Sequence, residues 1–86
     1  MHEMSIAMEV CRMAEERVGT ERAGQLVSLG LDVGDQAGVE ASNLEFCLET
    51  LLSIPPFTGA TPVIARCAGD VLRLTYLEVD DDRPRD

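Results

Sequence analysis

The sequence predicts an α+β domain in which two helices pack on one face of a three-stranded sheet. Apolar residues repeat with a helical period in two segments and with a period of two in two others, and a short fifth segment with Pro62 is expected to be an edge strand or to begin after the proline. The segments follow the order helix, strand, helix, strand, strand, and a sheet covered by both helices on one face would bury every apolar stripe. A chain of 86 residues that is 45% hydrophobic can build one such core.

The first helix is expected from about Met4 to Val18, with Gly19 as its stop. Its apolar positions have helical spacing and are Ile6, Ala7, Val10, Cys11, Ala14 and Val18. The first strand is expected from about Gln25 to Val33, because apolar and polar or small residues alternate there. Gly30 inside this strand indicates a close approach of another part of the chain.

The second helix is expected from about Asn43 to Ser53. Ser42 and Glu45 have the spacing of a capping box, in which the serine oxygen accepts from the backbone three residues on and the glutamate reaches back. The prolines at 55 and 56 prevent the helix from continuing.

Two strands are expected to follow, from Thr61 to Cys67 and from Val71 to Val79. The intervening Ala68-Gly69-Asp70 fits a hairpin turn between them. These elements complete a single domain over residues 1–79, and the polar, acidic residues 80–86 are expected to form a frayed tail.

The charge balance excludes several classes of partner. The formal net charge is −9, with seven basic residues against sixteen acidic ones, whereas binding to nucleic acids or anionic membranes needs lysine and arginine. An acidic chain suits metal cations or a basic protein partner, although solubility alone also explains the charge. No apolar run approaches the length of a membrane span, and no signal peptide is recognisable, so a cytoplasmic location is expected.

The residue inventory argues against an enzyme. General acid–base or nucleophilic chemistry needs a base near a nucleophile and an orienting group. The only histidine is His2, and no glycine-rich phosphate loop is present. We therefore expect a protein without catalytic residues.

The N-terminus, Met1-His2-Glu3, is the one chemically suggestive feature. A free amine, a peptide nitrogen and an imidazole lie within one residue of each other, and the amide of Glu3 can supply a fourth nitrogen. Four nitrogens in a plane suit Ni(II) or Cu(II). Metal and protons compete for these groups, so binding should weaken as pH falls. The alternative is that His2 is an ordinary polar residue at a frayed end.

Cysteine and methionine offer weaker signals. Cys11 and Cys47 fall on the apolar helix stripes and are expected in the core, whereas Cys67 is either structural or a surface ligand or intermolecular bridge. No CxxC pair is present, so neither a zinc knuckle nor a redox dithiol is indicated. The methionines at 1, 4, 8 and 13 resemble a soft-metal cluster, but packing explains them more simply.

Three stretches together resemble the HypA/HybF family of hydrogenase and urease nickel-incorporation proteins. They are MHEMSIAMEV at the start, LGLDVGDQAGVEASNLEFCLETL in the middle and GDVLRLTYLEV near the end. The resemblance implies nickel, rather than copper, at Met1, His2 and Glu3. It also implies nickel delivery to the [NiFe] hydrogenase large subunit or to urease, together with a HypB-like GTPase. The family domain, two helices on a three-stranded sheet, agrees with the order predicted from periodicity.

The chain departs from that family in one respect. Family members insert a zinc domain with two CxxC pairs before the last strand, and here only Cys67 stands at that place, so zinc is not expected. Two hypotheses follow: a nickel metallochaperone, or a zinc-less paralogue that acts as a metal-free protein-interaction module. Three strands also leave two sheet edges, so the chain is expected to be able to form a homodimer through one of them.

Overall fold

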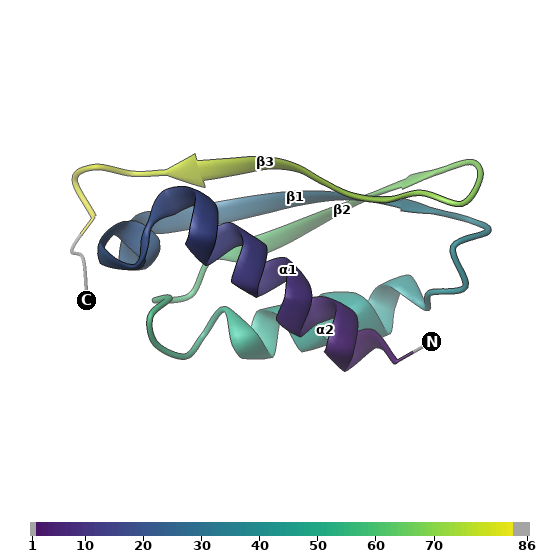
Figure 1. Ribbon diagram of the computed structural model, residues 1–86, viewed down its shortest axis with the longest axis horizontal. Helices are drawn as coiled ribbons and strands as arrows, with labels where there is room; N and C mark the ends of the chain where they lie inside the picture. Colours follow the sequence, from purple (N-terminus) through teal and green to yellow (C-terminus); the bar gives the residue numbers. More distant parts are fainter. Residues whose placement is uncertain (1, 84–86) are drawn as a thin grey trace.

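A three-stranded sheet and two α-helices that cover one of its faces make up residues 2–83, the part of the chain that the computed structural model describes (Figure 1). The predicted fold class is thereby confirmed. In chain order the elements are α1 (Glu3–Val18), the 3₁₀ helix η1 (Thr20–Gln25), β1 (Leu26–Gly34), α2 (Ala41–Leu51), β2 (Thr61–Cys67) and β3 (Leu72–Val79). The sequence predicted each of these elements except η1, which is too short to show a repeat.

The sheet has the order β2-β1-β3, so β1 is the central strand. It pairs parallel to β2 and antiparallel to β3. The predicted hairpin between the last two strands is therefore wrong. Helix α2 carries the chain back across the sheet so that β2 runs parallel to β1, as a strand–helix–strand unit requires. The central place goes to β1, whose leucines and Val33 are buried, whereas most residues of β2 and β3 are exposed or half-buried.

The connection from β2 to β3 crosses over the end of β1 and is tied to it by hydrogen bonds. The Asp35 NH donates to the Cys67 carbonyl oxygen (2.8 Å), and the Gly69 NH donates to the Asp35 carboxylate (2.9 Å). The Gly34 NH donates to the Val71 carbonyl oxygen (2.7 Å). A Cβ at Gly34 would overlap the carbonyl oxygen of Gly69, so only glycine allows this crossing.

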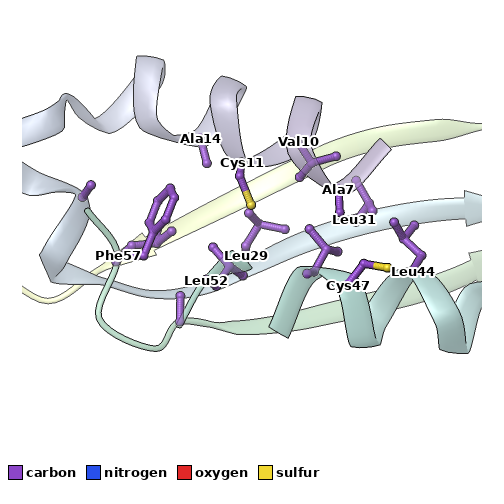
Figure 2. Packing of buried hydrophobic residues seen from close by; sticks show 14 of the residues in the cluster. Ala7, Val10, Cys11, Ala14, Leu29, Leu31, Leu44, Cys47, Leu52 and Phe57 are labelled. Carbon is purple, nitrogen blue, oxygen red and sulfur yellow. The ribbon is translucent and has the colours of Figure 1, made fainter. Parts of the chain in front are cut away.

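The core lies between the sheet and the two helices and is almost wholly aliphatic (Figure 2). Its largest fully buried side chains are Leu26, Leu29, Leu31, Val33, Leu44, Leu48 and Leu52. Cys11 and Cys47 are buried among them, as predicted, and both are free thiols. Burial raises the pKa of Cys11 to about 11, because the thiolate is poorly solvated there.

Helix α2 begins at Ala41 and is capped by Glu40, not by Ser42. The Glu40 carboxylate accepts from the Asn43 NH (2.6 Å) and from the Ser42 hydroxyl (2.6 Å). The capping-box prediction was wrong because the acidic side chain one residue before the helix reaches the free amide first, and the serine hydroxyl then becomes a donor to that carboxylate. An anionic cap also interacts favourably with the positive end of the helix dipole.

Two further predictions concern Gly30 and the tail. Gly30 lies under the ring of Tyr76, which confirms the close approach. Residues 80–83 are held against the start of β1: the Asp80 NH donates to the Gln25 carbonyl oxygen (2.9 Å), and the Arg83 guanidinium donates to the Leu26 carbonyl oxygen (3.0 Å). Fraying of residues 80–86 stays a prediction: these hydrogen bonds tie residues 80–83 to the sheet, and residues 84–86 lie outside the described part.

Candidate functional site

His2 lies immediately before α1, with an exposed side chain and an extended backbone (φ −85°, ψ 110°). Its carbonyl oxygen accepts from the Ile6 NH (3.3 Å), which is the first hydrogen bond of the helix, and its imidazole makes no capping bond. The amide of Glu3, the first helical residue, thus has no partner one turn earlier. Met1, the third predicted site residue, lies outside the described residues.

Glu3 links the starts of the two helices. Its carboxylate accepts from the Glu40 NH (3.2 Å) and from the Asn43 side-chain amide (2.9 Å). These two bonds, the Glu40 bond first, lower the pKa of the Glu3 carboxyl below its ordinary value. Sequence reasoning placed Glu3 in the metal site and missed this second role, because nothing local connects residue 3 with residues 40 and 43.

An apolar groove of about 460 Å³ runs between α1 and β3, and His2 lies on its rim. Helix α1 lines one wall with Ser5, Ile6, Glu9, Val10 and Met13, and the sheet lines the other with Leu31, Leu72 and Leu74. The structure therefore brings His2 together with Leu72 and Leu74, which lie about seventy residues later in the sequence. The alternation of β3 predicted apolar side chains on that strand, but not that they would lie beside His2.

The fold and the arrangement at the N-terminus can be compared with known proteins. A family model described as "Hydrogenase/urease nickel incorporation, metallochaperone, hypA" matches residues 1–72. This chain belongs to the HypA family. The resemblance of its opening and middle stretches is thereby confirmed, as is its place among nickel-incorporation and hydrogenase-maturation proteins.

Curated HypA relatives match along most of the chain. The hydrogenase maturation factor HypA of Chlorobaculum parvum is 39% identical over 67 residues, which are 78% of this chain and 59% of the relative. Its counterpart in Geobacter metallireducens is 36% identical, with 80% and 60% covered. That of Psychromonas ingrahamii is 37% identical over 80 residues, 92% of this chain and 70% of the relative. The chain thus spans about 60% of the length of the first two relatives.

A solved structure shares the fold. The solution structure of the nickel metallochaperone HypA from Helicobacter pylori superposes with a TM-score of 0.73. The alignment covers 92% of this chain and 97% of that chain, at 16% sequence identity. At this identity the similarity concerns the fold, which is the helix-covered sheet of Figure 1.

The three cysteines of this HypA-family chain are all free thiols. Cys11 and Cys47 are enclosed in the core, whereas Cys67 is half-buried at the end of β2. A structural zinc ion needs four nitrogen or sulfur ligands in a tetrahedron. Within residues 2–83, no group of three or more histidine, cysteine, aspartate or glutamate side chains is placed to hold a metal ion.

In the described part of the chain, neither helix has the length and apolar character that crossing a bilayer would need.

Proposed function

We propose that this HypA-family chain is a nickel metallochaperone that binds Ni(II) at its N-terminus for the maturation of [NiFe] hydrogenase or urease. The donors are the Met1 amine, the backbone nitrogen and imidazole of His2, and the backbone nitrogen of Glu3. The observation that carries the proposal is the position of His2: exposed, directly before a helix whose first amides have no intrahelical acceptor.

The chemistry at this position suits Ni(II). A metal-bound peptide nitrogen must lose its proton, and at the first turn of α1 that loss breaks no helical hydrogen bond. Four nitrogens in a plane favour nickel over zinc or magnesium. A cation beside the positive end of a helix is normally disfavoured, but deprotonated amides carry negative charge that offsets the dipole. Nickel is cargo here, and the chain performs no catalytic step.

The Glu3 carboxylate has a supporting role in this proposal. The carboxylate is bonded to the Glu40 amide and the Asn43 side chain, whereas the proposed nickel donor is the backbone nitrogen of Glu3. The carboxylate would therefore hold the start of α1 in place without being a ligand. By family membership we propose that the nickel passes to the hydrogenase large subunit or urease, with a HypB-like GTPase as partner.

Calorimetric titration of Ni(II) into protein that begins at Met1 tests the site. His2→Ala and a variant with one residue added before Met1 should each lose most of the binding, because one removes the imidazole and the other moves the amine. Glu3→Gln is the matched control: it keeps every backbone nitrogen and should still bind. Undiminished binding by the first two variants would exclude the N-terminal site.

The metal-free interaction module is the second candidate, and it is favoured by the lone Cys67 where the family carries a zinc domain. A pull-down of the cognate GTPase or hydrogenase subunit that survives His2→Ala, in cells whose hydrogenase activity is also unchanged by that variant, would support the module. Loss of nickel-dependent hydrogenase activity in His2→Ala cells would support the chaperone.

A further inference from the structure

The edge of the sheet at β3 carries backbone groups that no other strand uses. β3 pairs with β1 on one side, and within residues 2–83 no strand lies on the other. Because Gly34 donates to Val71, the register makes Asp32 and Arg73 the next hydrogen-bonded pair. Hydrogen-bonded and non-bonded pairs alternate in antiparallel sheets, so the backbone NH and C=O groups of Leu72 and Leu74 point away from β1.

The side chains of the same two residues line the apolar groove. Leu72 and Leu74 are two positions apart and therefore share a face of the strand, with Leu72 41% exposed. On the opposite wall, α1 presents Ile6, Val10 and Met13, which recur at helical spacing. A free strand edge beside a helix-lined apolar groove is the arrangement that receives an extended peptide as an added strand. The volume of about 460 Å³ falls in the range of ligand clefts, about 300–1,000 Å³.

The two sheet edges differ in their protection against such pairing. Proteins commonly block a free edge with proline, charges or a covering segment. β2, the other edge strand, contains Pro62. β3 has no proline, and its one basic side chain, Arg73, is engaged with Asp32 (2.7 Å). The β3 edge is therefore the one left open to another chain.

We propose that this groove and the β3 edge together bind an extended segment of a protein partner, with apolar residues at alternate positions and lysine or arginine between them. Backbone bonds to Leu72 and Leu74 would align the segment, and its apolar side chains would fill the groove. The net charge of −9 favours a basic segment and disfavours a second copy of this chain. The docked segment lies beside His2; its use in nickel transfer rests on the proposed function, but the docking itself does not.

A synthetic ten-residue peptide of alternating lysine and valine is a suitable probe. Added to ¹⁵N-labelled, metal-free protein, it should shift the backbone amide signals of β3 and of the groove-facing side of α1. Two matched peptides test the mechanism: one alternates glutamate and valine, and one carries N-methyl groups on every second residue. Both should bind at least about tenfold more weakly, because the first reverses the charge and the second blocks the backbone bonds.

Two variants with the same added charge locate the site. Leu72→Lys places a charge in the groove and should weaken binding of the basic peptide at least about tenfold. Val63→Lys places it on β2, at a residue of similar exposure (44%), and should leave binding nearly unchanged. Equal losses in both variants, shifts confined to other faces, or equal binding of the acidic peptide would overturn the proposal. So would light scattering that shows a β3-dependent dimer in place of peptide binding.

Nickel titration of the same proteins separates this proposal from the proposed function. Leu72→Lys should bind nickel like the parent, and the variant with one residue added before Met1 should bind the peptide like the parent, because every groove residue is unchanged in it. If the parent protein bound the peptide but not nickel, the N-terminal metal site would be refuted and the docking groove would stand. If the parent protein bound nickel but not the peptide, the docking groove would be refuted and the N-terminal metal site would stand.

Discussion

Among single residues, Glu3 connects the N-terminus to the rest of the fold. Its carboxylate holds the start of α1 against the start of α2 through Glu40 and Asn43, so residue 2 emerges from an anchored first turn. The bonds from Glu40 and Asn43 favour the ionised form of the Glu3 carboxyl and therefore lower its pKa. The first turn of α1 is thus held in place by a charged carboxylate.

A pH dependence follows from that lowered pKa. A carboxyl whose pKa is lower in the folded than in the unfolded state stabilises the fold above its unfolded pKa, near 4.5, and the contribution is lost as pH falls through the folded value. Glu3→Gln should therefore be less stable than the parent at pH 7, and the difference should close in strongly acidic buffer. Urea unfolding at several pH values measures it; a difference independent of pH would contradict this role.

Two glycines of β1 should respond differently to substitution by alanine. At Gly34 a Cβ would meet the backbone of Gly69 and Val71, which cannot swing aside, so Gly34→Ala should cost about 1–3 kcal/mol or more of unfolding free energy. At Gly30 it would meet the side chains of Tyr76 and Thr75, and Tyr76 is 45% exposed and can rotate outward. In the same urea titration, Gly30→Ala should lower the unfolding free energy less than Gly34→Ala does. A larger loss for Gly30→Ala would contradict the crossing of residues 69–71 over Gly34.

Among the elements, α2 offers a direct comparison of two caps. Glu40 accepts from the Asn43 amide, whereas Ser42 only donates to Glu40 and Glu45 makes no capping bond. Glu40→Ala should therefore lower the thermal midpoint more than Ser42→Ala, and Glu45→Ala should change it least. Circular dichroism melts of the three variants measure this order. A largest loss for Ser42→Ala would restore the capping-box interpretation.

Helices and strands could be predicted from the sequence because each is a local repeat of apolar residues. α1 begins one residue earlier than expected, and β2 has the predicted limits. A local repeat could not show whether the last two strands pair with each other. A short connection that contains glycine fits both a turn between neighbouring strands and a crossing over a third strand. Which strand is central depends on the burial of all three, and η1 has no periodic signal.

The metal-site prediction has a similar limit. His2 could be singled out because its chemistry depends only on its neighbours along the chain. The groove beside it could not, since Leu72 and Leu74 reach His2 only through the pairing of β3 with β1. The second role of Glu3 was missed for the same reason.

For the molecule as a whole, stability depends on the aliphatic core between the helices and the sheet. Leu48→Ala removes most of a fully buried side chain of α2 and should lower the unfolding free energy by about 2–5 kcal/mol. Phe46→Ala, two residues away but 65% exposed, is the matched control and should cost much less. Urea titration measures both. Similar losses of unfolding free energy in both variants would contradict the exposed position of the Phe46 side chain.

The placement of β3 has a consequence for assembly. His2 belongs to the first residues of the chain and Leu72 to the last strand, yet both line one groove. A nascent or truncated chain that lacks this strand has no Leu72 or Leu74 and so lacks most of the groove wall opposite α1. The groove thus exists only in molecules in which β3 has paired with β1 beside α1, and a partner that recognises it would select folded domains over partly folded ones.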